Sequence, residues 1–456
     1  MTTIAIILAA GKGTRMVSDL PKVLFALRGR TLIARAVAAA TQAFHQPPIV
    51  VVGPTSEDVR AACGAGARFA IQAQQLGTGH AVKVAADAAK SLNADAVAVM
   101  YGDMPLLPSD MLAALAVERE RSGAAIAMLT LMADNPRGFG RIARNASGAV
   151  TEIVEEVAAT PEQLRIRELN VGVYCFDAAW LWAALERIQP NPRKGEYFLT
   201  DLVEIAVAEG RLVVSIPSDD ADAFIGINTR ADLADADAAL RRRINHAWML
   251  KGVSMADPAS AYIDDDVVLS PDVTVLPNTH LLGATRIGTG SVIGPNCVLR
   301  NAQIGRGCVV QQSSIEDSSL DDGADAGPFA RLRGGARIGP GTHIGNFAEI
   351  KNSTLGPGVK MGHFSYLGDA TVGAEANISA GVVTCNFDGQ KKQPTTIGDG
   401  AFVGCDTMLV APVTVGARAL TGAGAVVTHD VAPGARVVGV PARPLAPKSP
   451  GTPGKE

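Results

Sequence analysis

The sequence has few aromatic residues, no excess of basic charge and no long apolar run. Aromatic residues make up 4% of the 456 residues, against 48 glycines, which favours small-residue turns over large aromatic cores. The formal net charge of −4 gives no global field for nucleic acid or acidic membranes, although local cationic pockets are compatible with it. No segment approaches the ~18 apolar residues of a membrane span. We therefore expect no nucleic-acid partner and no membrane insertion.

Cysteine is sparse and unclustered. Because the six cysteines form no CxxC pair and no metal-ligand cluster, they are predicted to be buried, reduced thiols. The N-terminus has no cationic leader, and its apolar run of about seven residues is too short for a signal peptide. Together these features predict a soluble protein of a reducing compartment, the cytoplasm. The cysteines are Cys63, Cys175, Cys297, Cys308, Cys385 and Cys405.

The chain is too long for one ordinary core, and its two halves have different patterns. Residues 1–228 alternate short apolar strands with Ala-rich helices, which predicts a Rossmann-like α/β domain with a mostly parallel sheet. Ligands of such sheets collect beyond the carboxyl ends of the strands. Residues 229–252 predict one linking helix. The predicted strands are Thr3–Ala9, Pro48–Val52, Ala94–Met100 and Ala124–Leu131, and the predicted helices include Leu32–Ala43 and His80–Lys90.

From residue 263 an apolar residue recurs every six positions, often followed by glycine. Three flat walls of six residues make an 18-residue coil, so the pattern predicts a parallel β-helix over 253–445. The pattern slips by one at Ile304 and fails between Val383 and Ile397, where a polar segment predicts an extruded loop. The Pro/Gly-rich tail, 446–456, is predicted to be disordered. The recurring residues include Ile263, Leu269, Val275, Leu281, Ile287, Ile293, Leu299, Leu332, Ile338, Ile344 and Ile350.

The stretch "LAAGKGTRM", Leu8–Met16, follows the first strand and fits neither familiar phosphate-binding pattern. A P-loop would need Ser or Thr where Gly13 stands, and a dinucleotide fingerprint would need glycine at Met16. What remains is a glycine-rich turn whose backbone N–H groups and Arg15 face an anion. A plain strand-to-helix turn is the simpler alternative.

Further motifs favour a nucleotide site. Lys22 adds a second cation, and "IQAQQLGTGHA" supplies Gln72 to read a base edge and Gly77-Thr78 to allow a close backbone approach. Asp103 follows a buried strand in "YGDMPL", where a carboxylate is costly unless it is paired or binds metal. With phosphates nearby, Mg²⁺ is the natural counter-ion, although a capping aspartate is the simpler alternative.

Polar residues also cluster on successive coils of the predicted β-helix. Arg333 and Lys351 lie 18 residues apart, so two cations fall on adjacent coils and suit a sugar phosphate. A lone histidine on a solenoid is more often structural. The same motifs place Lys351, Tyr366 and Glu349 near His363, which favours a functional role. Neutral imidazole, with an ordinary pKa of about 6.5, suits a general base. Asn377 completes this predicted cluster.

These motifs resemble a known family of sugar nucleotidyltransferases. The motifs that carry the resemblance are G-x-G-T-R-M…P-K, QLGTGHA, YGDMPL, "GFGRI" and "GEYFLTD". With the hexapeptide half attached, nearly the whole chain is similar to the bacterial bifunctional N-acetylglucosamine-1-phosphate uridyltransferases/glucosamine-1-phosphate acetyltransferases. The resemblance implies a left-handed β-helix, a homotrimer with acetyl-transfer sites between adjacent helices, and a role in peptidoglycan and lipopolysaccharide precursor synthesis. It also implies that UTP and acetyl-CoA are co-substrates and that the uridyltransferase site uses Mg²⁺.

The resemblance gives a role to each matching residue of the first half. The backbone of Leu8, Ala9, Ala10 and Gly11 would hold uridine with Gln72, Gly77 and Thr78, and Tyr101 would complete the UTP site. Arg15 and Lys22 would bind the triphosphate, and Asp103 and Asn228 would bind Mg²⁺. Gly140, Glu155 and Asn170, with Asn228, would contact N-acetylglucosamine-1-phosphate.

In the second half, the resemblance makes His363 the general base and Glu349 its orienter. Arg333, Lys351, Tyr366, Asn377 and Lys392 would bind glucosamine-1-phosphate, and Asn386, Phe387, Cys405 and Ala423 would contact acetyl-CoA. Phe387 and Cys405 replace the Tyr and Ser common in relatives. The segment "VVGVPARP" lacks the arginine that many relatives place before Val-Pro, for which Arg436 and Arg443 are candidate substitutes.

Two other functions are compatible with parts of the pattern. A monofunctional nucleotidyltransferase could use the β-helix only for assembly or regulation, and a non-catalytic scaffold could sequester nucleotide sugars. The polar cluster around His363 counts against the first alternative, because a purely structural solenoid does not need it. Asp103, Asn228 and Lys22 count against the second.

Overall fold

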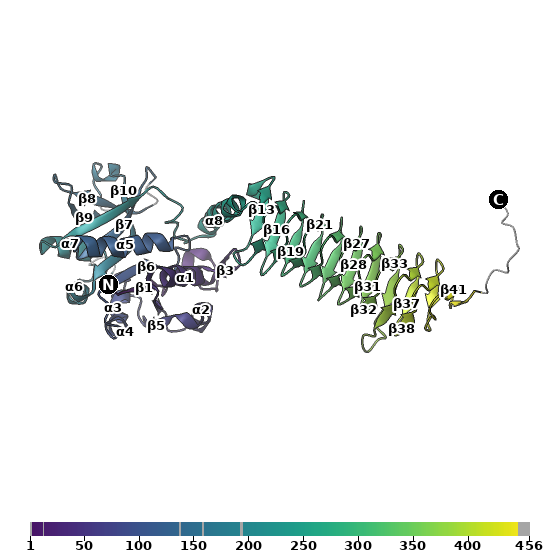
Figure 1. Cartoon of the computed structure of the whole chain (residues 1–456). Helices are drawn as coiled ribbons and strands as arrows, with labels where there is room; N and C mark the ends of the chain where they lie inside the picture. The colour runs from purple at the N-terminus through teal and green to yellow at the C-terminus, as the bar shows by residue number, and fades with distance from the viewer. Residues whose placement is uncertain (1, 12, 136–137, 157–158, 192–194, 446–456) are drawn as a thin grey trace. The chain divides into compact units, whose positions relative to one another are not determined.

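The chain divides into two compact units, Met1–Leu240 and Arg241–Glu456, each with its own core. The computed structural model describes residues 2–11, 13–135, 138–156, 159–191 and 195–445, so the predicted tail, 446–456, lies outside the described residues. The first unit is a sheet among helices, and the second is a stack of short strands (Figure 1). Helix α8 (Arg230–Leu250) occupies the segment predicted as a linking helix, and the division falls within it.

Six of the seven strands along the main path of the first unit's sheet run in one direction. The path is β11-β7-β10-β6-β1-β4-β5, and β10 is antiparallel to both its neighbours. The predicted mostly parallel sheet is therefore confirmed, with a reversal at β10, which is preceded in the chain by a hairpin of β8 and β9 and a short 3₁₀ helix (Gln163–Arg165). The strands are β1 (Thr3–Leu8), β4 (Ile49–Val52), β5 (Arg68–Ile71), β6 (Ala96–Tyr101), β7 (Ile126–Met132), β8 (Gly140–Arg144), β9 (Val150–Val154), β10 (Glu168–Asp177) and β11 (Val213–Ser218).

Alternate residues of β1 enter different cores, which explains why the strand is apolar throughout. Ile4 and Ile6 pack into one cluster, and Ala5 and Ile7 into the other. The helix predicted over His80–Lys90 is two helices that meet at Ala85. Helices α3 (Thr78–Val84), α4 (Ala86–Lys90), α6 (Ala178–Leu185) and α7 (Asp201–Ala208) contribute to the first cluster, and α1 (Leu32–Phe44), α2 (Glu57–Ala62) and α5 (Ser109–Ser122) to the second.

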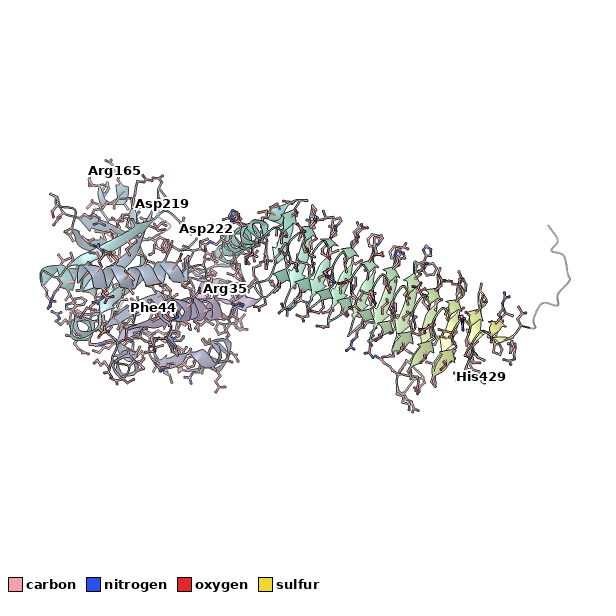
Figure 2. All side chains as sticks on the ribbon, viewed as in Figure 1. Arg35, Phe44, Arg165, Asp219, Asp222 and His429 are labelled. Atoms are coloured by element: carbon pink, nitrogen blue, oxygen red, sulfur yellow. The ribbon has the colours of Figure 1, made fainter. Side chains whose placement is uncertain are left out.

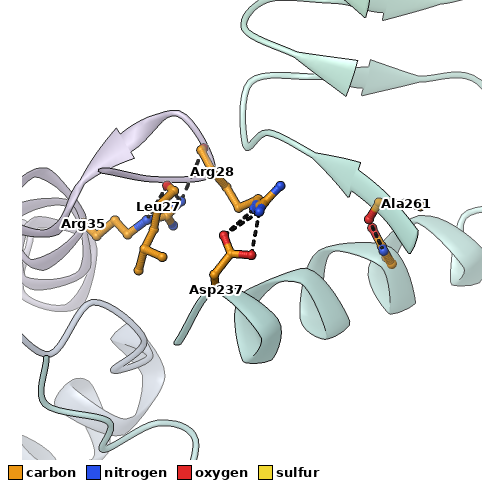
Figure 3. Close-up of polar contacts among 6 residues, drawn as sticks. Leu27, Arg28, Arg35, Asp237 and Ala261 are labelled. Carbon is orange, nitrogen blue, oxygen red and sulfur yellow. Dashed lines mark hydrogen bonds and ion pairs between the residues drawn. The ribbon is translucent and has the colours of Figure 1, made fainter. Parts of the chain in front are cut away.

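A small hairpin of β2 (Ala26–Leu27) and β3 (Arg30–Thr31) holds the beginning of α8 within the first unit. Arg28, in the hairpin turn, donates to both carboxylate oxygens of Asp237, each at 2.5 Å from Nη2 (Figure 3). Arg35 on α1 donates to Leu27 O at 2.6 Å, which fixes the hairpin on the helix. The pair is two-pronged, which is the strong geometry for an arginine–carboxylate contact.

The second unit is a β-helix of three parallel sheets. One face comprises β12 (Ser254–Met255), β15 (Thr274–Val275), β18 (Val292–Ile293), β21 (Val309–Val310), β24 (Asp325–Ala326), β27 (His343–Ile344), β30 (Lys360–Met361), β33 (Asn377–Ile378), β36 (Phe402–Val403), β39 (Leu420–Thr421) and β41 (Arg436–Val438), with β42 (Arg443–Pro444) added antiparallel. The second comprises β13 (Ala261–Ile263), β16 (Thr279–Leu282), β19 (Val298–Arg300), β22 (Ser314–Glu316), β25 (Arg331–Arg333), β28 (Ala348–Lys351), β31 (Ser365–Gly368), β34 (Val383–Cys385), β37 (Met408–Val410) and β40 (Val426–Val427). The third comprises β14 (Val268–Leu269), β17 (Arg286–Ile287), β20 (Gln303–Ile304), β23 (Ser319–Leu320), β26 (Arg337–Ile338), β29 (Thr354–Leu355), β32 (Ala370–Val372), β35 (Thr395–Ile397) and β38 (Val413–Val415).

The residues of the six-residue pattern form the core of this unit, as predicted. The spacing shortens by one at Ile304, as predicted, and also at Ile315, Leu320, Leu355 and Val372, each of which is buried. At the corners, Asn and Asp adopt positive φ and stack: Asn352 Nδ2 donates to Asp369 Oδ1 at 2.6 Å. The left-handed sense of the coil stays a prediction.

The C-terminal part of α8 closes the start of the β-helix. Ile244 and Trp248 pack against its core. Asn245, 1% exposed, donates from Nδ2 to Pro258 O at 2.7 Å and to Ala261 O at 2.9 Å. Solenoids need such a cap because the first coil has no neighbour on one side.

The cysteine prediction needs correction at two positions. Four cysteines are buried, but Cys385 is half-buried and Cys405 is exposed, because Cys405 lies on a corner between β36 and β37 and not on an inward-facing position. All six are free thiols. Across the described residues, none of the helices has the length and apolar character that crossing a membrane requires.

Candidate functional sites

The first candidate site lies where β1 and β6 end. The two strands pair in parallel with Leu8 opposite Tyr101, and β1 continues to β4 on its other side, so the order of strands reverses here. A cavity of about 270 Å³ opens at this point. Ten residues predicted to bind the nucleotide line it: Leu8, Ala9, Ala10, Gly11, Lys22, Gln72, Gly77, Thr78, Tyr101 and Asp103.

The glycine-rich loop packs directly against Lys22. Gly13 has a φ of +60°, and a Cβ there would lie 2.6 Å from Lys22 Cβ, so both the backbone and the available space require glycine. Arg15 is exposed and lines neither this cavity nor the one that adjoins it. Burial opposes the charged form of Asp232, but amide hydrogen bonds from Asn228 and Thr229 and the nearby Arg15 charge lower its pKa overall.

Lys22 joins the two residues predicted to bind metal. Its Nζ donates to Asp103 Oδ2 and, at 3.0 Å, to Asn228 Oδ1. Two hard oxygen donors that already face one cation fit Mg²⁺, which takes few protein ligands and keeps water and phosphate oxygens. No group of three His, Cys, Asp or Glu with metal-binding geometry occurs among the described residues, so substrate oxygens would have to complete the coordination.

A second cavity, of about 330 Å³, adjoins the first. Gly140, Glu155, Asn170 and Asn228, the predicted sugar-phosphate contacts, all line it. Burial, together with the charges of Asp103 and Glu155, raises the pKa of Tyr101, so its hydroxyl stays protonated. The two cavities share four lining residues: Thr78, Tyr101, Asp103 and Phe198.

The sequence reasoning missed several lining residues. Gln75, whose Nε2 donates to Ala10 O, lies one residue before the LGTG motif, and this proximity was the signal that could have identified it. Glu196 and Phe198 lie in the GEYFLTD motif, which was quoted without assigning roles within it. Phe139 and Phe224 line the second cavity. Phe224 had no local signal.

The GEYFLTD segment positions the LGTG turn. Gly79 N donates to Tyr197 O at 2.8 Å, and Thr78 Oγ1 accepts from Leu199 N at 3.0 Å. Gly77 has a φ of +99°, and a Cβ there would lie 2.6 Å from Tyr197 O. The turn therefore tolerates no side chain at Gly77, in agreement with its predicted role in close approach.

The second candidate site is a column of polar residues on β25, β28 and β31. Arg333 pairs with Lys351 on the next coil, and Glu349 pairs with Tyr366. Arg333 donates to Glu349 Oε1 at 2.7 Å. A hydrogen bond with Lys392 and repulsion from its charge lower the pKa of Lys351, with smaller contributions from desolvation and then from the charge of Arg333. Clustered cations of this kind are stabilised by an anion.

His363 is exposed on the corner between β30 and β31. Within the described part of the chain it has no hydrogen-bond partner, and Glu349, its predicted orienter, is instead paired with Arg333. A backbone ladder links this corner to those of the next coils: Gly381 N donates to Phe364 O, Asp406 N to Ala380 O and Gly424 N to Cys405 O. The corner that carries His363 thus continues, coil by coil, to the predicted acetyl-CoA contacts Cys405 and Ala423.

The extruded loop begins at Asn386, which is buried and tied to Asp369. Asn386 Nδ2 donates to Asp369 Oδ2 at 2.5 Å. The exposed Phe387 and Lys392 pair across the loop in an antiparallel bridge. The loop occupies the position where the sequence pattern predicts it.

The remaining predicted residues lie elsewhere on the β-helix. Asn377 is on β33, on a different face from Arg333 and Lys351, and donates to Ser379 Oγ at 3.1 Å. Within one chain it therefore does not join the polar column. Arg436 on β41 and Arg443 on β42 are both exposed.

Comparison with known proteins identifies both halves. Residues 5–169 match the MobA-like NTP transferase domain, and residues 266–301 and 394–429 match the bacterial transferase hexapeptide (six repeats). The chain is 46% identical over 408 residues to the bifunctional protein GlmU of Heliobacterium modesticaldum, covering 90% of this chain and 89% of that protein. It is 43% identical over 412 residues to that of Exiguobacterium sibiricum, covering 90% and 92%, and 44% identical over 411 residues to that of Pelobacter propionicus, covering 90% and 89%. With a nucleotidyltransferase half joined to a hexapeptide transferase half, this chain belongs to the family of bifunctional GlmU proteins.

Proposed function

We propose that the chain makes UDP-N-acetylglucosamine from glucosamine-1-phosphate in two steps, at the two sites described above. Its family makes it a bifunctional transferase of uridylyl and acetyl groups. The observation that carries the proposal is the pair of adjoining cavities, which share Asp103 and Tyr101 and suit a nucleotide beside a sugar phosphate.

At the first site, a phosphate oxygen of N-acetylglucosamine-1-phosphate would attack the α-phosphorus of UTP. An O–P bond forms, the bond to the β-phosphate breaks and pyrophosphate leaves. No covalent nucleophile is needed, because positioning and neutralisation of charge are sufficient for this step. Gly11 and Gln72 would hold the uridine and Lys22 the phosphates, while Glu155 and Asn170 would hold the sugar.

Asp103 and Asn228 would hold Mg²⁺. Bound there, the ion would neutralise phosphate charge as the pyrophosphate leaves. Lys22, which now bridges the two oxygens, would then turn toward the phosphates. Arg15 would reach the triphosphate by moving away from Asp232.

At the second site, His363 would take a proton from the amine of glucosamine-1-phosphate as the nitrogen attacks the acetyl-CoA thioester. The C–N bond forms, the C–S bond breaks and coenzyme A leaves. Arg333, Lys351 and Lys392 would hold the phosphate, with Tyr366 and Asn377 on the sugar. The corner ladder from His363 to Ala423 would support the coenzyme, with Asn386 and Phe387 from the extruded loop.

Because Asn377 lies on a different face from Arg333 and Lys351, a site between two chains would let one copy supply Asn377 and its neighbour supply the two cations. We propose a homotrimer, which would bring the two faces of adjacent β-helices together. Use of UTP and acetyl-CoA as co-substrates supports a cytoplasmic location.

The test is a coupled assay with glucosamine-1-phosphate, acetyl-CoA, UTP and Mg²⁺, in which coenzyme A and pyrophosphate are measured separately. We expect both products, with pyrophosphate release dependent on acetyl-CoA. Absence of coenzyme A release from glucosamine-1-phosphate, with pyrophosphate released once N-acetylglucosamine-1-phosphate is supplied instead, would favour the monofunctional alternative. Release of neither product would favour the non-catalytic scaffold.

Gly368→Ala should selectively slow acetyl transfer. A Cβ at this position would lie 2.4 Å from Tyr366 Oη and 2.6 Å from Asn386 Nδ2, so both predicted substrate contacts must shift. A displacement near 1 Å costs roughly 10- to 100-fold in rate. The measurement is coenzyme A release, with pyrophosphate release from N-acetylglucosamine-1-phosphate and UTP as the internal control. Acetyl transfer at the unmodified rate would contradict the assignment of Tyr366 and Asn386.

A further inference from the structure

The amide nitrogen of Gln72 has two partners within the protein, and together they take both of its hydrogens. Gln72 is 4% exposed, and its Nε2 lies 3.1 Å from Gly77 O and 3.1 Å from His80 Nδ1. Gly77 O can only accept, so the nitrogen of the amide must face it. Nε2 has no lone pair to offer, so His80 Nδ1 must be the acceptor of the second hydrogen.

This arrangement fixes the state of both side chains. His80 is neutral, with its proton on Nε2, and burial, followed by the charge of Lys83, lowers its pKa in the same direction. The Gln72 amide cannot turn over without losing both bonds. Gln72 lines the nucleotide cavity. Because both amide hydrogens are already bonded, Oε1 is the polar atom of Gln72 that can bind a ligand there.

An acceptor fixed at this position distinguishes between pyrimidines. Uracil has an N3–H donor between its two carbonyl oxygens, whereas cytosine has an unprotonated N3 that is itself an acceptor. Two acceptors facing each other leave a buried lone pair unpaired, which disfavours the wrong base. The amide would lose this discrimination if its second hydrogen were free to turn toward the cavity.

We propose that His80 is a positioning residue that makes the site specific for uracil nucleotides by fixing the direction of the Gln72 amide. His80 lies outside the nucleotide cavity, against Tyr197 and Lys83 in a separate cavity of about 390 Å³, so it acts through Gln72. The inference rests on the proposed function, because it concerns the nucleotide of the uridylyl-transfer step.

The test uses a matched pair of polar substitutions in the full chain. In His80→Asn, Oδ1 takes the place of the Nδ1 acceptor, whereas in His80→Gln the amide reaches the place of Nε2 and leaves the Nδ1 position empty. For each protein, kcat and KM are measured with UTP and with CTP, using N-acetylglucosamine-1-phosphate. The thermal midpoint is measured alongside as a check of folding.

We expect His80→Gln to reduce the ratio of kcat/KM for UTP to that for CTP by about tenfold, mainly through KM, as loss of a buried hydrogen bond predicts. His80→Asn should keep the ratio within about threefold, since the acceptor is restored. Equal ratios in the two variants would overturn the inference, whether both keep the preference or both lose it. If the unmodified protein does not use UTP, the proposed function fails instead, so the two failures are distinguishable.

Discussion

Replacement of His363 by alanine should abolish acetyl transfer while uridylyl transfer persists. His363 is the proposed base that takes the amine proton, and general-base catalysis typically contributes ~10²- to 10⁴-fold. The loss should appear in coenzyme A release from glucosamine-1-phosphate and acetyl-CoA. Because His363 is exposed and makes no hydrogen bond to a described residue, its removal should leave the thermal midpoint unchanged.

His429→Ala is the matched control. His429 is also exposed and lies farther along the same β-helix (Figure 2), and its side chain forms a hydrogen bond with its neighbour Thr428. It should retain both activities. If His363→Ala lost both activities equally while it stayed folded, the model of two independent sites would be wrong.

Replacement of Asp103 by alanine should have the opposite effect, with loss of pyrophosphate release and unchanged acetyl transfer. The substitution removes a proposed metal ligand and leaves Asn228 as the remaining one of the pair. Removing one electrostatic contact to a transition state typically costs ~10²- to 10³-fold. The variant should also need more Mg²⁺ for half-maximal rate, which a titration of pyrophosphate release against Mg²⁺ would measure.

Asp110→Ala is the control for Asp103. Asp110 is seven positions along, exposed in the first turn of α5, with its carboxylate accepting from its neighbour Met111 N. It should retain the rate and the Mg²⁺ dependence of the unmodified protein. An Asp103→Ala variant whose Mg²⁺ dependence matched this control would remove Asp103 from the metal site.

The fold was largely predictable because its signals are periodic or local. The six-residue repeat predicts which side chains face inward, and each of the recurring residues lies in the core. The ends of β1 and β6 were equally visible, because each is an apolar run that stops at a glycine-rich or acidic motif. Reversal of β10 had no such signal, since β-branched and apolar residues suit either direction of a strand.

The contacts within the sites were less accessible to sequence reasoning. Lys22 meets Asp103 and Asn228 across separations of 81 and 206 residues, and the family resemblance, not the spacing, brought them together. An even 18-residue coil would place Asp369 beside Lys351, whereas the shortened coil places Gly368 there. The Arg333–Glu349 ion pair follows from rotamers on adjacent coils, which no spacing specifies.

The extruded loop has a consequence for how this half can change over evolutionary time. Val372 pairs with Ile397, 25 residues on, although the pairings on either side, Leu355 with Val372 and Ile397 with Val415, span 17 and 18. The added residues are absorbed at one corner, and the ladder resumes in register on the next strand. Because each coil contacts only its neighbours, insertions, deletions and substitutions at this corner can accumulate without disturbing the rest of the β-helix. Residues of this loop such as Phe387 can therefore change without altering the pairing that holds Arg333, Lys351 and Tyr366 on their strands.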